Sequence, residues 1–200
     1  MTLQDFIEKY DKPDTIVLLE GKRNVMDEDE EKIEQFGRLI AAQTQHIIFR
    51  SGNALGADLY FSRGVSSVDK ERLEAIIPYS GHRKATNYAH KTVSLDDVNF
   101  LNEPKVVFHS KNHKPTKNLV DKYVSGKRDS FSLKGAYIIR DTVKVLGLKG
   151  TLLPATFGFF YDDFTNPEQG GTGHTMQVCR MNGVPFVNQH VWMTWLNSIA

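Results

Sequence analysis

The chain has 200 residues, of which 40% are hydrophobic and 24% are charged, and this composition is typical of one globular domain with a sizeable core. Its formal net charge of +1 gives no global electrostatic case for binding nucleic acid or a membrane surface, and no apolar run approaches the roughly 18 residues of a membrane span. The single cysteine, Cys179, excludes an intrachain disulfide and fits a reducing compartment, so we expect a cytoplasmic protein.

Apolar runs and helical periodicity alternate along the first 80 or so residues. The apolar runs are continuous, which indicates strands covered on both faces, as in a parallel sheet. Gly64 is a typical glycine stop and should end the helix before it. The alternation predicts an α/β fold, Rossmann-like and doubly wound, with a mostly parallel sheet and helices on both faces. The strands are expected at residues 15–19, 46–49 and 73–77, and the helices at residues 1–9, from about 29, and at 54–63.

Residues 85–130 do not continue this alternation, and we expect an insertion there within a single domain of residues 1–200. Residues 105–108 fit a strand or a packed extended segment. His109 and His113 are four residues apart, a spacing that could hold a metal on a helix. Pro115 and the polar residues between the histidines argue against a helix, so we predict no metal site.

The last third of the chain contains the remaining predicted elements. A long helix should run from Ser130 to Gly147, because apolar residues recur in it at helical spacing. A buried strand within residues 151–161 and a helix at residues 175–182 should follow. Tryptophans and aliphatic residues near the end predict a packed closing helix; these are Trp192, Trp195, Leu196 and Ile199.

A glycine-rich stretch separates that strand from the helix at 175–182. Helix N-termini offer free N–H groups and the positive end of the helix dipole, and glycines let the backbone approach an anion closely. The stretch therefore predicts a phosphate site, with a plain glycine-rich turn as the alternative. The residues assigned to it are Gly170, Gly171, Thr172, Gly173, His174 and Thr175.

Each predicted strand also ends at a polar or glycine-rich loop. Ligands bind parallel sheets beyond the carboxyl ends of the strands, where the strand order reverses, so these loops should form a nucleotide-shaped pocket. Arg50 should anchor the ligand through a bidentate contact with phosphate. Asp58, Asp162 and Asp163 remain for sugar hydroxyls or a base edge, and ordinary loop residues are the alternative interpretation. The further predicted ligand-binding residues are Gly21, Lys22, Arg23, Arg50, Ser51, Gly52, Asn53, Asp58, Arg83 and Arg140.

Four of these features together resemble the SLOG superfamily. They are the Gly-Lys-Arg after the first strand, the Ser-Gly-Asn-Ala-Leu-Gly-Ala-Asp stretch at 51–58, the Arg140-Asp141 helix and the late glycine stretch. The superfamily contains Rossmann-like nucleotide-binding domains related to the DNA-processing protein DprA, the YpsA-like proteins and the Lonely Guy (LOG) phosphoribohydrolases. The resemblance covers the sheet but not residues 85–130. It implies a nucleotide or nucleotide-derived ligand, with phosphate on the glycine stretch.

The chain departs from the LOG motif Pro-Gly-Gly-x-Gly-Thr-x-x-Glu, in which the glutamate serves glycosidic cleavage. Gln169, His174 and Gln177 stand where that motif has proline, threonine and glutamate. Glutamine cannot act as a general base or stabilise an oxocarbenium ion by charge. The change leaves phosphate binding possible and makes LOG-type hydrolysis doubtful.

Three functions remain open from the sequence. The leading one is a nucleotide-binding sensor or carrier, with a small-molecule nucleotide as partner, no separate cofactor, and room for a homo-oligomer. The second is a nucleoside-phosphate N-glycosidase in which His174, Asp162 or Asp163 replaces the missing glutamate. The third, a DprA-like single-stranded DNA-binding module, is disfavoured by the near-zero charge and by the lack of a basic stripe with interleaved aromatic residues.

Overall fold

The computed structural model describes residues 1–112 and 116–197, and a six-stranded parallel sheet lies at its centre. The predictions that involve His113, Pro115 and Ile199 therefore lie outside the described residues. The strands are β1 (Ile16–Gly21), β2 (Ile48–Ser51), β3 (Leu73–Ile77), β4 (Lys91–Ser94), β5 (Phe157–Tyr161) and β6 (Phe186–Asn188). Their order is β4-β3-β2-β1-β5-β6 and every pairing is parallel. The order runs outward from β1 in both directions, so the topological switch point lies between β1 and β5.

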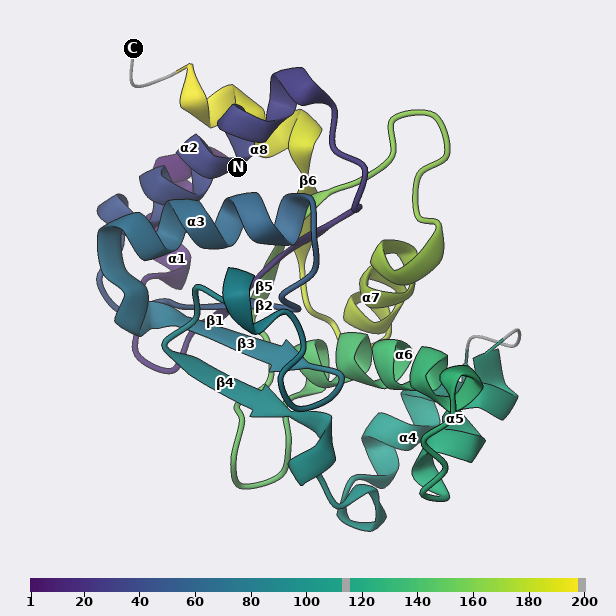
Figure 1. Ribbon diagram of the computed structural model, residues 1–200. Helices are drawn as coiled ribbons and strands as arrows, with labels where there is room; N and C mark the ends of the chain where they lie inside the picture. The colour runs from purple at the N-terminus through teal and green to yellow at the C-terminus, as the bar shows by residue number, and fades with distance from the viewer. Residues whose placement is uncertain (113–115, 198–200) are drawn as a thin grey trace.

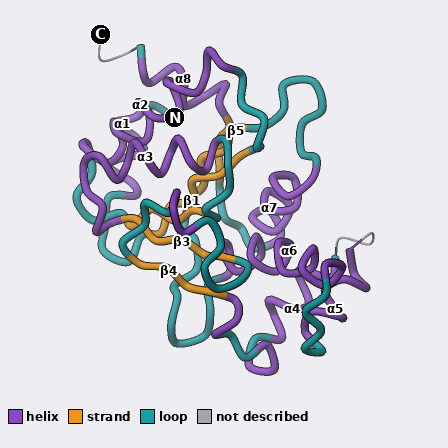
Figure 2. The backbone as a smooth tube through the Cα atoms, viewed as in Figure 1, coloured by secondary structure: helices purple, strands orange, loops and turns teal. Residues whose placement is uncertain are grey.

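Helices cover both faces of this sheet (Figures 1 and 2). They are α1 (Leu3–Tyr10), α2 (Asp27–Gln43), α3 (Ala57–Asp69), α4 (Pro104–Lys111), α5 (Lys117–Val124), α6 (Ser130–Leu146), α7 (Gly170–Met181) and α8 (Gln189–Leu196). One face packs against α1, α2, α3 and α8, while α6 and α7 pack on the other and α4 and α5 lie against α6. This arrangement confirms the predicted doubly wound α/β fold. Within the described residues, no helix is long and apolar enough to cross a membrane.

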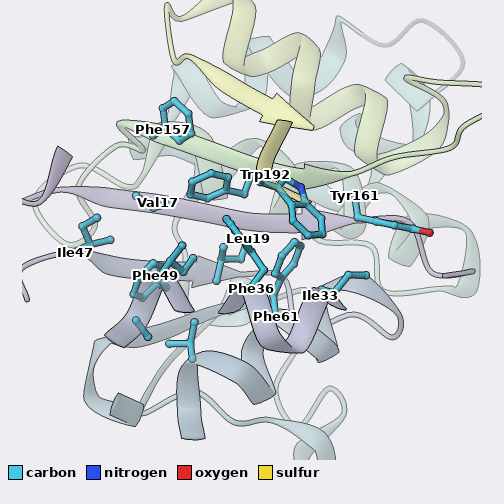
Figure 3. Close-up of a cluster of buried hydrophobic side chains, with 14 of the residues drawn as sticks. Val17, Leu19, Ile33, Phe36, Ile47, Phe49, Phe61, Phe157, Tyr161 and Trp192 are labelled. Atoms are coloured by element: carbon cyan, nitrogen blue, oxygen red, sulfur yellow. The ribbon is translucent and has the colours of Figure 1, made fainter. Parts of the chain in front are cut away.

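Alternation of side chains along β1 divides the core between the two faces. Val17 and Leu19 belong to the cluster under α2 and α3 (Figure 3). Leu18 belongs to the cluster under α6 and α7. Both faces of the strand are therefore apolar, as the continuous run predicted. Trp192 of α8 closes the first cluster, with its ring centroid 4.7 Å from that of Phe36.

Gly64 does not end α3, which continues to Asp69, so the predicted stop is wrong. A Cβ on Gly64 would lie 2.1 Å from the carbonyl oxygen of Glu34 in α2. A Cβ on Gly37 of α2 would likewise lie 2.5 Å from the carbonyl oxygen of Phe61 in α3. The two glycines let the backbones of α2 and α3 approach closely, and this packing explains Gly64 better than a helix end does.

Residues 85–130 supply the edge strand β4 and the helices α4 and α5. The prediction of a strand or extended segment at 105–108 is wrong, because these residues lie within α4. Pro104 occupies the first turn of that helix, where backbone N–H groups have no partner within the helix and the missing N–H of proline costs no hydrogen bond. Val106 is buried and Phe108 is exposed, so the apolar run straddles the helix instead of lying on one strand.

Candidate functional site

A cavity of about 480 Å³ lies at the carboxyl edge of the sheet, where β1 ends and α7 begins. Its walls come from the end of β1 and the following loop, from the start of α3, from α6 and from the first turn of α7. This is the switch-point position that parallel sheets use for ligands. The predicted site residues that line it are Gly21, Lys22, Arg23, Asp58, Arg140, Gly170, Gly171 and Thr172.

The glycine-rich stretch forms the first turn of α7 and not a loop before it. The helix begins at Gly170, and Gln169 at its N-cap makes no side-chain cap hydrogen bond. The first N–H groups of a helix have no carbonyl partner within the helix, and they carry the positive end of its dipole. Gly170 has a φ of 62°, which favours glycine, and no other group lies within 4 Å of the position of a Cβ there. The first turn of α7 therefore presents open backbone to the cavity.

The second half of the glycine stretch faces away from the cavity, contrary to the prediction of a wrapped anion. A Cβ on Gly173 would lie 1.8 Å from the carbonyl oxygen of Glu168. His174 is 3% exposed, and its Nε2 lies 2.9 Å from Oγ1 of Thr142 in α6. Thr175 is fully buried and donates to the carbonyl of Gly171. These three residues pack α7 against its neighbours, and none of them lines the cavity.

Arg50 also lies away from the cavity, so its position does not fit the predicted phosphate anchor. Its side chain has no exposed surface. Nε lies 2.6 Å from Oε1 of Glu74, and Nη1 donates to the carbonyl of Lys144 at 2.8 Å. The guanidinium thus ties β2 to β3 and to α6, which is a structural role.

The other residues predicted after β2 and β3 support the cavity from outside. Ser51 and Asn53 are buried in the turn, where Nδ2 of Asn53 donates to the carbonyl of His82. Gly52 donates its N–H to Asp58 and accepts from Nη1 of Arg140. Arg83 has a left-handed φ of 49° and does not line the cavity.

Asp162 and Asp163 organise the loop between β5 and α7 and do not line the cavity. Asp162 accepts from the N–H groups of Asp163 and Glu168. Asp163 is paired with Lys22 and also accepts from Thr165 and Asn166. The hydrogen bond from Lys22 holds the pKa of Asp163 well below its usual range, so this carboxyl is ionised and unsuited to donate a proton.

Five buried charged residues form one side of the cavity, which we call the charged floor; they are Glu20, Asp58, Arg140, Asp141 and Lys144. Lys144 is paired with Glu20 and lies 2.9 Å from Oδ1 of Asp141. Arg140 donates to the same oxygen from Nε at 3.0 Å and from Nη2 at 2.7 Å. Asp58 accepts the N–H groups of Gly21 and Gly52. The charges therefore form one connected network from β1, α3 and α6.

Burial controls the protonation of this network. It raises the pKa of Asp58, against the opposing charge of Arg140 and the N–H groups of Gly21, Gly52 and Ala54. Burial also raises the pKa of Asp141 to about 6, although Arg140 acts in the opposite direction. A carboxyl that titrates near neutrality in a cavity is a mark of functional sites.

An aromatic wall stands beside the charged floor. Tyr137 lines the cavity, with the guanidinium of Arg23 5.8 Å and that of Arg140 5.3 Å from its ring centroid. His82 packs edge-on against Tyr137 and Tyr79, and burial, followed by nearby arginines, lowers its pKa to about 4. The wall thus carries a flat face and cations next to it, which suit a planar ring and an anion.

The sequence predictions missed Tyr137, Asp141 and Lys144 as cavity residues, although Asp141 stands in the quoted Arg140-Asp141 pair. Together with Arg140 they occupy positions i, i+3, i+4 and i+7 of α6, which is one helix face. That spacing was the available signal. Glu20 carried no such signal, because it continues an apolar strand. In the described part of the chain, no group of three or more His, Cys, Asp and Glu residues is arranged to hold a metal.

Comparisons with known proteins found a similar solved structure and no matching family. No family model matches the chain, and neither does any curated protein. Among solved structures, the chain is similar to the DNA processing protein A (DprA) from Streptococcus pneumoniae, with a TM-score of 0.48 and 12% sequence identity. The match covers 92% of this chain and 51% of DprA, so the chain spans about half the length of that protein.

Proposed function

We propose that this protein binds a nucleotide or a nucleotide-derived molecule at the carboxyl edge of its sheet and acts as a sensor or carrier. The ligand phosphate lies on the first turn of α7, at Gly170, Gly171 and Thr172. Its base and sugar occupy the space between this turn and Tyr137. We expect no cofactor apart from this nucleotide ligand.

The observation that carries this proposal is the open start of α7 within a cavity at the switch point. An uncapped helix N-terminus is a ready anion site, since its N–H groups and dipole favour negative charge. The start of α3 also lines this cavity, but its first turn carries the carboxylate of Asp58, which would repel phosphate when ionised. The first turn of α7 lines this cavity with Gly170, Gly171 and Thr172, and the Cβ position of Gly170 is open.

The cations of the cavity suit the same ligand. Arg23 is exposed and stands over Tyr137, and Lys134 lines the cavity from α6. A planar base stacked on the tyrosine would lie within reach of both cations. The volume of about 480 Å³ falls within the range of roughly 300 to 1,000 Å³ that is usual for small-molecule sites.

Binding is a better reading of the site than hydrolysis by the residues that the sequence suggested. His174 is buried between α6 and α7, and Asp162 and Asp163 accept backbone N–H groups in the β5–α7 loop. None of the three reaches the cavity. We expect AMP and GMP to be bound without release of the base.

The test is a matched pair of substitutions at Gly170, read by calorimetric titration with AMP, GMP, cyclic AMP and ADP-ribose. Aspartate and asparagine have nearly the same size, and both tolerate a positive φ, so Gly170→Asp and Gly170→Asn differ mainly in charge. The carboxylate would face the phosphate and repel it by about 1 to 4 kcal/mol at 4 Å, depending on the effective dielectric. We expect the aspartate variant to bind at least fivefold more weakly than the asparagine variant.

Two results would count against the proposal. The first is that the wild-type protein binds none of the four nucleotides. The second is equal affinity of the two Gly170 variants, which would remove the phosphate from the start of α7. Melting curves of both variants check that they are folded.

A further inference from the structure

A carboxylate of the protein itself lies against the turn that the proposed function gives to phosphate. Oδ1 of Asp141 is held by Arg140 and Lys144. Oδ2 faces the start of α7, because a Cβ on Gly171 would lie 2.9 Å from it. An ionised Asp141 therefore already places negative charge at this helix N-terminus, and a bound phosphate would lie beside a like charge.

The buried charges of the floor, Asp141 included, do not sum to zero when all are ionised. Arg140 and Lys144 come from its own helix, Glu20 from β1 and Asp58 from α3, while Arg23 approaches from the loop after β1. The first turn of α7, Gly170 to Thr172, has no ionisable side chain. Burial lowers the pKa of Lys144 well below its usual range, but its contacts with the carboxylates of Glu20 and Asp141 favour the charged form. With Lys144 charged, the charged floor holds three carboxylates and two cations, a net charge of −1, and one proton makes it neutral. Arg23 is exposed and adds a screened charge at the rim.

We propose that binding of the anionic ligand is coupled to the uptake of one proton from solvent, and that Asp141 is the group that takes it. This inference rests on the proposed function. Protonation removes the negative charge from Oδ2 and turns the carboxyl into a hydrogen-bond donor toward a phosphate oxygen. The ligand then meets a neutral floor and the full field of the α7 N-terminus.

Asp141 is favoured over the two other carboxyls of the floor by its contacts. Asp58 accepts the N–H groups of Gly21 and Gly52, which stabilise its ionised form. Glu20 is paired with Lys144. Asp141 is also paired, since its Oδ1 accepts from Arg140 and lies near Lys144. It alone of the three lies against Gly171, through Oδ2, and burial raises its pKa to about 6 in the free protein despite the charge of Arg140.

The sign of the pH dependence follows from this coupling. The complex holds a proton that the free protein loses above about pH 6, so affinity falls as the pH rises through and beyond that value. The fall approaches tenfold per pH unit and flattens below the titration of Asp141. A ligand that binds without a proton would show no such slope.

The experiment is calorimetric titration of the wild-type protein at pH 7.5 in two buffers of different ionisation enthalpy. The probes are ADP-ribose and cyclic AMP, whose phosphate groups do not titrate near neutrality. We expect an uptake close to one proton per ligand, and an affinity that weakens from pH 6 to pH 8. If only AMP binds, its own phosphate titrates, and the difference in proton uptake between wild type and Asp141→Asn gives the same number.

Asp141→Asn should abolish the proton uptake and the pH slope, and at pH 8 it should bind at least tenfold more tightly than wild type. Its floor holds two carboxylates and two cations and is neutral without a proton. The control is Glu168→Gln, which removes an exposed carboxylate, paired with Arg180, just before α7 and outside the cavity. That variant should keep both the uptake and the slope.

The outcomes separate this inference from the proposed function. Nucleotide binding with no proton uptake and a flat affinity overturns the inference and leaves the proposed function standing. An absence of nucleotide binding overturns both. If Asp141→Asn does not fold, the wild-type proton count still tests the coupling, and Asp141→Ser in its place tests whether Asp141 takes the proton.

Discussion

Gly173 is the position where the structure and the sequence make opposite predictions. As a phosphate-loop glycine, it should tolerate a side chain in the free protein and lose only its ligand. In the structure, a Cβ at Gly173 would lie 1.8 Å from the carbonyl oxygen and 2.2 Å from the carbonyl carbon of Glu168. Both atoms belong to the backbone, so the β5–α7 loop or the helix must move to accept even alanine.

The expected cost of Gly173→Ala can be worked from two opposing effects. Overpacking of a buried position costs about 1 to 3 kcal/mol, and a clash with backbone belongs at the upper end of that range or above it. Alanine recovers up to about 1 kcal/mol through its better helix propensity. A net loss of about 2 kcal/mol or more should lower the Tm by roughly 4 °C or more in a domain of this size.

Thermal and urea denaturation of Gly173→Ala measure this loss, with Gly170→Ala as the matched control. Gly170 lies in the same first turn but has open space around its Cβ position, so alanine there costs only the strain of its φ of 62°, about 1 kcal/mol. Gly173→Ala should therefore melt below Gly170→Ala. A Gly173→Ala protein that melts with the wild type would refute the packing argument and return Gly173 to a ligand-facing loop.

Two further predictions concern residues that the sequence placed in the site and the structure places in the core. Arg50→Met leaves the carboxylate of Glu74 buried, with Lys91 at 3.7 Å as its remaining ion-pair partner among the described residues. Urea denaturation should show a loss of about 3 to 5 kcal/mol in the free energy of unfolding, and Arg50→Met/Glu74→Leu should recover most of it. An equal loss in both variants would contradict the ion-pair argument. His174→Ala removes the contact with Thr142 and opens a buried space, so it should destabilise the protein by about 1 to 3 kcal/mol. The nucleotide affinity of the folded fraction should stay unchanged. A tenfold loss of affinity would restore His174 to the site.

Much of the fold could be predicted from the sequence because its strands are buried on both faces. The runs that contain β1 and β5 are apolar without alternation, as strands covered on both faces require. The predicted run at 46–49 overlaps only the first half of β2, which continues to Arg50 and Ser51, and β3 includes Glu74. The edge strand β4 escaped notice because Lys91–Ser94 is short, polar and half exposed. The apolar run at 105–108 suggested a strand but lies in α4, since four residues are too few to distinguish a strand from a helix. Pro104, just before the run, was the better signal, because proline is common in the first turn of a helix.

Eight of the residues predicted for the site line the cavity, but others that lie near strand ends or in the glycine stretch point elsewhere. Arg50 does stand near the end of β2, yet it is paired in register with Glu74 on β3, so its charge is satisfied across the sheet. A sequence shows that a residue lies near a strand end, but the neighbour that register places beside it depends on the whole sheet. The same limit applies to α7, where a shift of the helix start to Gly170 turned the second half of the glycine stretch into a packing face.

Under the proposed function, the charged floor serves the ligand more than it serves stability. Taking five ionisable groups out of water costs more than their mutual attraction reliably returns, and apolar residues of similar volume often hold a core at least as well. Lys144 and Glu20 are almost fully buried, yet they line the cavity, as do Asp141 and Arg140. The floor places the carboxylate of Asp141 beside the start of α7. In the proposed function, this arrangement acts on the anionic ligand that binds in the cavity. The proton uptake proposed for Asp141 is the most direct measurement of that role, because it is read in the wild-type protein while the ligand binds.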